Sequence, residues 1–323
     1  MNIEMIEAAA ARLKGHARRT PMLTSPFLDK IARRRILIKP ECLQHTGSFK
    51  YRGARSAISA LEGPGGVVAY SSGNHAQGVA LAAKELGRPA VIVMPADAPQ
   101  VKIENTRALG AEVVLYDRET EDREKIGKAL SQERDLTLVR PFDEPQVIAG
   151  QGTVGLEIAE QAAELGVTAG DVLVCCGGGG LTSGIALALE ARAPGLRPRP
   201  VEPEEFDDVT RSLRSGKIER NTRLSGSLCD AIITPQPGVL TFPILKRLCG
   251  PGIVVPEEDC LRAMALAADR LKLVTEPGGA IALAAALFHG DHIKGDAAVV
   301  MISGGNVDMP VLVRALSDYG DSA

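Results

Sequence analysis

The sequence predicts an α/β protein with two open, parallel-sheet domains. Apolar stretches of strand length alternate with helical patterns along most of the chain, which is typical of parallel βαβ units. Two breaks rich in glycine or proline, Gly63-Pro64-Gly65-Gly66 and Arg140 to Pro145, set off a middle section. We therefore expect a small domain at residues 63–147, inserted into a large discontinuous domain at residues 1–62 and 148–323.

The expected elements follow from apolar periodicity and from capping residues. Residues 2–14 carry apolar side chains at helical spacing, and Ser25 is placed to begin a second helix. Residues 36–38 read as a strand that leads into the loop around Lys50, and residues 51–61 as the helix behind it. In the middle section we expect strands at 67–70, 90–94 and 112–115, and helices at 77–86 and 101–109.

The section after the second break continues the alternation. A helix is expected from Gln151 to Leu165, then a strand at 172–174 and a helix over 185–189. Later elements are expected at 257–271 and 280–288, both helical, and at 297–302, a strand. Because ligand loops of open parallel sheets lie at the carboxyl ends of the strands, the segment Ser71 to His75 is a candidate ligand loop.

Composition excludes several classes of function. With 323 residues, of which 45% are hydrophobic, the chain can bury its cores without disulfides or metal staples. The balance of 37 basic and 40 acidic residues gives a net charge of −3, so we expect no nucleic-acid or membrane partner. The six cysteines lack C-x-x-C spacing, and the chain shows no leader pattern, which predicts reduced thiols and a cytoplasmic location.

Lys50 is the strongest candidate for a reactive residue. It lies in His45-Thr46-Gly47-Ser48-Phe49-Lys50-Tyr51-Arg52-Gly53, at the expected start of a helix. Partial burial and the helix dipole lower the pKa of a lysine, and a neutral amine forms an imine with an aldehyde. The alternative is a solvated lysine on a helix that Ser48 caps.

A run of glycines supplies a candidate phosphate cradle. Gly177-Gly178-Gly179-Gly180-Leu181 follows an apolar strand and precedes a helix. Successive glycines let backbone N–H groups surround phosphate oxygens, and the helix N-terminus adds partial positive charge.

Together with Ser71-Ser72-Gly73-Asn74-His75 and Ser303-Gly304-Gly305-Asn306, the lysine and glycine motifs form a specific set. The set resembles fold-type II pyridoxal-phosphate (PLP) enzymes of the tryptophan-synthase-β type, and more narrowly the serine/threonine dehydratase and serine racemase family. The resemblance implies a large PLP-binding domain and a small substrate-binding domain with the cofactor between them. It covers nearly the whole chain.

The resemblance also implies roles for individual residues. Lys50 would hold the cofactor as an imine and, once freed, remove the Cα proton of the substrate. Ser303 would face the pyridine nitrogen, and its neutral hydroxyl would leave the ring unprotonated, which favours elimination over transamination. The other cofactor contacts implied are Phe49, Asn74, Glu276 and the phosphate-binding residues Gly177, Gly178, Gly179, Gly180 and Leu181.

Substrate contacts are implied on the other side of the cofactor. Ser72 would face the side of Cα opposite to Lys50, which permits racemisation. His75 is equally explained as a helix residue with a satisfied ring, and Arg123, the match to a distal substrate arginine, as part of a solvated helix face. The full set of implied substrate contacts is Ser71, Ser72, Asn74, His75 and Arg123.

A divalent metal position is implied by Glu202, Phe206 and Asp208. Two carboxylates and the carbonyl of Phe206 are hard oxygen ligands, which suit Mg²⁺ or Ca²⁺. Phe206 replaces the alanine usual in the family, and an acidic surface loop is the alternative.

These implications predict a PLP-dependent ammonia-lyase that converts an L-3-hydroxy amino acid (threonine, serine or 3-hydroxyaspartate) to a 2-oxo acid and ammonia. One alternative is a serine or aspartate racemase with side dehydratase activity. Another is an NAD-dependent dehydrogenase, since Glu202 follows the glycines at the spacing of a ribose-binding acid. A non-catalytic cofactor-binding protein is a third. We expect a small amino-acid substrate, a homodimer and no C-terminal effector domain.

Overall fold

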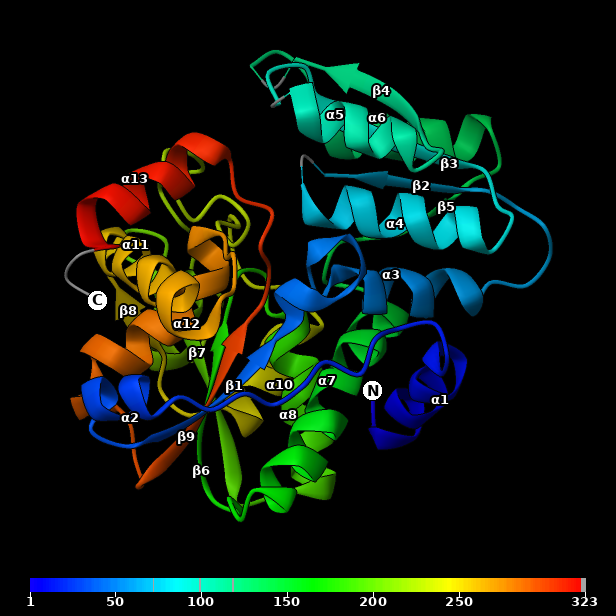
Figure 1. The fold of residues 1–323 in the computed structure, drawn as a ribbon. Helices are drawn as coiled ribbons and strands as arrows, with labels where there is room; N and C mark the ends of the chain where they lie inside the picture. The colour runs from blue at the N-terminus through cyan, green and yellow to red at the C-terminus, as the bar shows by residue number, and fades with distance from the viewer. Residues whose placement is uncertain (72, 99, 118, 321–323) are drawn as a thin grey trace.

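The computed structural model describes residues 1–71, 73–98, 100–117 and 119–320. Within these residues the strands form two separate sheets, and every strand pair is parallel, so the predicted fold class is confirmed (Figure 1). The larger sheet has the order β1 (Arg35–Pro40), β9 (Ala297–Ile302), β6 (Gly170–Cys175), β7 (Leu196–Pro203) and β8 (Ile253–Val255). The smaller sheet has the order β4 (Glu112–Tyr116), β3 (Ala90–Pro95), β2 (Val67–Tyr70) and β5 (Thr137–Leu138).

Helices cover both sheets. Those around the smaller sheet are α4 (Asn74–Glu85), α5 (Gln100–Ala108) and α6 (Arg123–Glu133). Those around the larger sheet are α1 (Ile3–Leu13), α2 (Pro26–Ala32), α7 (Pro145–Glu164), α8 (Gly180–Arg192), α9 (Asp208–Ser215), α10 (Thr241–Leu248), α11 (Glu257–Leu266), α12 (Pro277–Phe288) and α13 (Met309–Tyr319). The remaining helix, α3 (Lys50–Ser59), packs between α4 and α7. A π-helical turn, Ala267–Leu271, continues α11, and short 3₁₀ turns lie at Glu41–Leu43, His45–Gly47 and Gly290–His292.

The sheets form where strand sequences are apolar without alternation. Val172, Leu173 and Val174 of β6 are fully buried, as expected for a strand with helices on both of its faces. Sequence analysis did not predict β7, because Leu-Arg-Pro-Arg-Pro-Val-Glu-Pro carries three prolines and no apolar run. It also placed the starts of α4 and α7 too late, at Gln77 and Gln151.

The protein has two lobes, a small one around the smaller sheet and a large one around the larger sheet. Helix α3 lies between them (Figure 1). Its apolar residues Tyr51, Ala54 and Ile58 belong to a buried cluster that includes residues of the smaller sheet, and α3 also packs against α7. Gly78 of α4 permits this approach, because a Cβ there would lie 3.1 Å from the backbone of Lys50. The start of α3 is therefore held between elements of both lobes, while the division at residues 62/63 and 147/148 stays a prediction.

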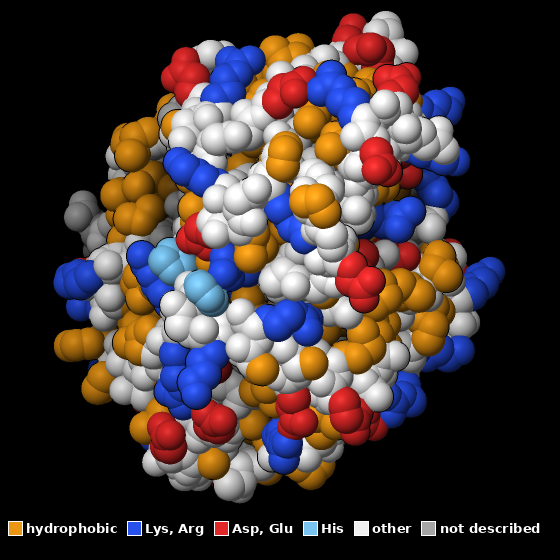
Figure 2. All heavy atoms as spheres, turned by 90° about the vertical axis from the view of Figure 1, so that its right-hand side faces the viewer, with side chains coloured by type: hydrophobic (Ala, Val, Ile, Leu, Met, Phe, Trp, Pro, Cys, Tyr) orange, Lys and Arg blue, Asp and Glu red, His pale blue; other side chains and the backbone are white. Residues whose placement is uncertain are grey.

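The surface carries charges of both signs. Figure 2 shows lysine, arginine, aspartate and glutamate side chains mixed over one face of the molecule. Among the helices of the described residues, none has both the length and the apolar character needed to cross a membrane.

Candidate active site

Lys50 is the first residue of α3, and its amine lies inside a pocket between the lobes. Nζ donates a hydrogen bond of 2.9 Å to the carbonyl oxygen of Pro141 and lies 5.2 Å from the centroid of the Phe49 ring. Burial lowers the pKa of Lys50 to about 8, although Cys175 and Glu276 oppose the shift. A substantial fraction of the amine is therefore neutral near pH 8. The alternative of a solvated lysine is wrong, and Ser48 makes no cap hydrogen bond.

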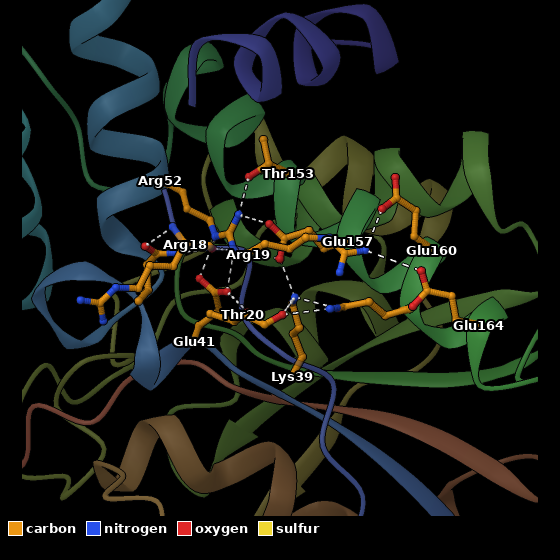
Figure 3. Close-up of polar contacts among 12 residues, drawn as sticks. Arg18, Arg19, Thr20, Lys39, Glu41, Arg52, Thr153, Glu157, Glu160 and Glu164 are labelled. Carbon is orange, nitrogen blue, oxygen red and sulfur yellow. Dashed lines mark hydrogen bonds and ion pairs between the residues drawn. The ribbon is translucent and has the colours of Figure 1, made fainter. Parts of the chain in front are cut away.

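A buried network of charges fixes the start of α3 (Figure 3). Arg52, one residue beyond Tyr51, donates through Nε and Nη2 to the carboxylate of Glu41, both at 2.8 Å, and through Nη1 to Glu157 at 2.6 Å. Lys39 donates to Glu157 at 2.5 Å and to Gln161 at 2.8 Å. Two cations thus face two anions, and β1, α3 and α7 are joined close to Lys50.

The glycine run, Gly177 to Gly180, lines the same pocket as Lys50 and lies at the N-terminus of α8. Gly179 has φ = +90°, which favours glycine, and α8 begins at the next residue. A Cβ at Gly178 would lie 2.3 Å from the Phe142 ring, and one at Gly177 would lie 2.8 Å from the Ile232 carbonyl oxygen. Side chains would therefore fill a cradle whose backbone N–H groups and helix terminus suit a phosphate.

The residues around Lys50 and the glycine run line one cavity, which we call the inner pocket. It contains Phe49, Lys50, Asn74, Pro141, Phe142, Gln151, Gly177, Gly178, Gly179, Gly180, Leu181, Thr234, Glu276 and Ser303, among others. It therefore gathers every cofactor contact expected from the sequence.

Asn74 and Glu276 lie at one side of the inner pocket. The Asn74 side-chain amide donates to Oε1 of Glu276 at 2.6 Å, and Asn306 donates to Oδ1 of Asn74 at 2.7 Å. Burial raises the pKa of Glu276 to about 7, with a further contribution from Asp230. The amide of Asn74 is thus held in one orientation at the pocket wall.

Ser303 lies at the end of β9, where the larger sheet meets the inner pocket. It is 3% exposed, and its carbonyl oxygen accepts the N–H of Phe49 at 3.1 Å. Its hydroxyl lies beside the thiol of Cys175, whose pKa burial raises to about 11. At this end of the inner pocket, the Ser303 hydroxyl is therefore an uncharged polar group that a ligand could contact.

A second cavity, which we call the outer pocket, adjoins the first and shares Lys50, Asn74, Thr234 and Glu276 with it. It also contains the expected substrate contacts Ser71, His75 and Arg123. His75 Nε2 lies 3.0 Å from the carbonyl oxygen of Val139, and burial lowers the pKa of His75 to about 3, so the ring is neutral. Ser72, the remaining expected contact, lies outside the described residues.

Arg123 and Lys102 bring two cationic side chains to the outer pocket, which Asp230 also lines. The guanidinium of Arg123 lies 5.6 Å from the centroid of the Tyr70 ring. Lys102 of α5 lies 3.8 Å from Asp230 and 3.7 Å from Asp308, so it links elements of both lobes. Sequence analysis missed Lys102, because one lysine in a polar helix gives no signal of its own.

The residues of the expected metal site lie together, but their groups already have protein partners. Both oxygens of Glu202 accept hydrogen bonds from backbone N–H groups at the start of α9, and Oε2 also accepts the Thr210 hydroxyl at 2.6 Å. Asp208 accepts from Asn221 at 2.6 Å through Oδ1, while Oδ2 has no partner among the described residues. Burial raises the pKa of Glu202 to about 8 and that of Asp208 to about 7. Glu202, Phe206 and Asp208 are all buried, whereas Glu204 and Glu205 of the turn between them are exposed. No group of three or more histidine, cysteine or acidic residues placed for a metal ion occurs in the described part of the chain.

These features define an enzyme site for a phosphorylated aldehyde. They are a lysine amine of lowered pKa, a glycine cradle at a helix N-terminus, and a cleft between two parallel sheets. Comparison with known proteins gives the family. The protein-family model described as "Pyridoxal-phosphate dependent enzyme" matches residues 13–305. The chain therefore belongs to the family of pyridoxal-phosphate dependent enzymes.

Individual relatives agree with this assignment. The chain is 43% identical over 304 residues to an L-threo-3-hydroxyaspartate ammonia-lyase of Pseudomonas sp, covering 93% of this chain and 94% of the relative. It is 39% identical over 315 residues to a serine racemase of Schizosaccharomyces pombe, covering 97% and 96%. The solved structure of a threonine deaminase from T.th. superposes with a TM-score of 0.91 at 46% identity, covering 96% of this chain and 99% of that one.

The cofactor of the family fits the inner pocket. The residues that would hold it are Lys50 at the aldehyde, Gly177 to Leu181 at the phosphate, and Phe49, Asn74 and Ser303 around the ring. The dehydrogenase alternative has lost its support, because Glu202 is fully buried and its oxygens cap α9 instead of facing a ligand.

Proposed function

We propose that the protein is an ammonia-lyase that removes water from an L-3-hydroxy amino acid to give an enamine, which then takes up water and releases a 2-oxo acid and ammonia. The observation that carries the proposal is the placement of Lys50 and Ser303 in one pocket, a lysine with a pKa of about 8 and an uncharged hydroxyl. The names of the relatives, which include hydroxyaspartate and threonine ammonia-lyases, support it.

Bound pyridoxal phosphate supplies an electron sink that weakens the Cα–H bond of an attached amino acid. Lys50 is the residue that takes this proton, and its lowered pKa makes the amine neutral and basic close to the working pH. Ser303 would offer the ring nitrogen a neutral hydroxyl in place of an acid, so the ring would stay uncharged and elimination would be favoured over transamination. Loss of the β-hydroxyl with the electron pair is then the favoured outcome.

The substrate carboxylate would bind at the Ser71 to His75 loop, where α4 begins. Asn74 and His75 are the first residues of α4, so its N-terminal dipole favours an anion there. Neutral His75 provides a polar contact without competing for the proton that Lys50 removes.

Within this class we propose 3-hydroxyaspartate as the preferred substrate. Arg123 lines the outer pocket, and its guanidinium favours a second carboxylate over the methyl group of threonine; Lys102 also lines this pocket but is shared with Asp230 and Asp308. Two curated relatives, at 43% and 40% identity, act on L-threo-3-hydroxyaspartate. The test is turnover of L-threo-3-hydroxyaspartate, L-threonine and L-serine, with oxo acid, ammonia and substrate chirality all followed.

Serine racemisation is the second candidate. Relatives named serine racemase are 39% identical to this chain, and Ser72 is the residue expected on the second face of Cα. Inversion of L-serine at a rate above that of its deamination would favour this alternative.

We also propose that a divalent cation binds at Glu202, Asp208 and the Phe206 carbonyl. The support is the buried, partner-free Oδ2 of Asp208 close to a second carboxylate, an arrangement that a cation would stabilise. Oε1 of Glu202 accepts a single hydrogen bond, so it keeps a lone pair for a cation. The cation would support the fold and take no part in the reaction.

We propose that the chain forms a homodimer. Met309, Val313 and Leu316 expose apolar side chains on one face of α13, and such a face is suited to burial against a second copy. Sedimentation velocity tests this: a single species of one chain's mass would contradict it.

A further inference from the structure

Gln151 carries a side-chain amide that the protein itself does not satisfy. It belongs to α7 and is 1% exposed, yet neither Oε1 nor Nε2 has a hydrogen-bond partner among the described residues. A buried polar group without a partner destabilises a protein, so its presence calls for an explanation.

The position of this amide points to a ligand. Gln151 lines the inner pocket together with Lys50 and the glycine run. Nε2 lies against Gly53, where a Cβ would approach it to 2.3 Å, so glycine at that position gives the amide its space. Gly53 is three residues beyond Lys50 in α3, which places the amide over the turn of the helix that carries the lysine.

We infer that Gln151 is a further contact of the bound cofactor, with its Nε2 donating a hydrogen bond to a pyridoxal-phosphate oxygen. The inference rests on the assignment of the inner pocket to pyridoxal phosphate. A bound cofactor would then supply the partner that Nε2 lacks among the described residues, so the amide acts for affinity at a cost in stability.

The same helix provides a matched control. Gln161 is 5% exposed, but each of its two amide atoms has a partner: Oε1 accepts from Lys39 at 2.8 Å and Nε2 donates to the Thr20 carbonyl oxygen at 3.0 Å. Gln161 is absent from the inner pocket. Two buried glutamines of α7 therefore differ in whether the protein alone satisfies them.

The experiment compares Gln151→Leu and Gln161→Leu with the wild type, each as the full chain freed of cofactor and then titrated with pyridoxal phosphate. Gln151→Leu should raise the Kd for pyridoxal phosphate about fivefold, the effect of one lost hydrogen bond. Its cofactor-free Tm should be unchanged or higher. Gln161→Leu should bind the cofactor as the wild type does and should lower the cofactor-free Tm.

A parallel titration with pyridoxal, which lacks the phosphate, locates the contact. If Gln151→Leu weakens pyridoxal phosphate alone, the amide donates to the phosphate; if it weakens both ligands, the amide donates to the ring oxygen. A Kd for pyridoxal phosphate within threefold of the wild-type value would overturn the inference, as would a fall in cofactor-free Tm as large as that of Gln161→Leu. Failure of the wild type to take up pyridoxal phosphate would instead overturn the assignment of the pocket.

Discussion

Asn74 donates a 2.6 Å hydrogen bond to Oε1 of Glu276, although 202 positions separate them in the sequence. Asn74 begins α4 beside the smaller sheet, and Glu276 directly precedes α12 in the large lobe. The contact therefore joins the two lobes at the wall of the inner pocket. It also buries a carboxylate whose charge the protein compensates only in part.

Glu276 should make stability depend on pH. Burial raises its folded-state pKa to about 7, above the value near 4.5 of an unfolded chain, so the folded protein binds the extra proton between these pH values. The contribution of this group to stability is present below pH 4.5 and is lost as the pH rises through 7. Glu276→Gln keeps an acceptor for Asn74 but cannot ionise, so its stability should not fall in this way as the pH rises. Urea unfolding at pH 5 and pH 8.5 should show the variant gaining on the wild type by up to a few kcal/mol at the higher pH. An equal difference at both pH values would contradict the assignment.

Arg52 should be far more important for stability than a surface arginine. Arg52→Lys removes the planar group that reaches Glu41 and Glu157 together, and it leaves buried charge without a full partner. We expect a loss of about 3 kcal/mol in the free energy of unfolding. The control is Arg19→Lys, whose pair with Glu160 is exposed and should change stability by less than about 1 kcal/mol. Similar losses for the two variants would show that the buried network of Arg52, Glu41 and Glu157 in Figure 3 is not a stabilising unit.

Ser303 should determine the fate of the reaction. Ser303→Asp places an acid where the neutral hydroxyl stands, which favours a protonated ring nitrogen and a longer-lived carbanion. We expect a changed absorption spectrum of the bound cofactor and at least a tenfold loss of oxo-acid formation. Ser303→Ala should have a smaller effect, because the ring stays neutral. A Ser303→Asp enzyme with the wild-type spectrum and rate would refute this role.

The proposed cation should reveal itself in chelator experiments. A metal bound only by the folded state adds RT ln(1 + [L]/Kd), about 2.7 kcal/mol at a hundredfold excess over Kd. Chelator should therefore lower the Tm of the wild type. Asp208→Asn, which keeps an oxygen for Asn221, should lose this response. If chelator affects the variant and the wild type equally, the cation binds elsewhere or not at all.

The sequence was sufficient for the fold class and for most of the inner pocket. The apolar strands β2, β3, β6 and β9 were predicted because strands buried on both faces have nearly continuous apolar sequences. The glycine motif was found because it directly follows a strand, and the lysine motif because it opens a helix, and local sequence fixes the backbone at both places.

Other features depend on long-range contacts and left no local signal. The prolines of β7 conceal a strand that gains its partners from β6 and β8. The orphaned amide of Gln151 is visible only once α3 and α7 are packed together. The capping of α9 by Glu202 likewise depends on the turn between β7 and α9, which the spacing of acidic residues does not reveal.

The most direct test of the account is formation of oxo acid and ammonia from L-threo-3-hydroxyaspartate by the wild type and by Lys50→Ala, both shown to be folded. For the wild type, we predict that kcat rises with pH through about 8, because the Lys50 amine, freed from the cofactor once the substrate is bound, must be neutral to accept the proton. Lys50→Ala should lose activity by a factor of at least about 10³. A folded, cofactor-loaded Lys50→Ala protein that forms oxo acid at the wild-type rate would contradict the account, as would a wild type that only inverts its substrates.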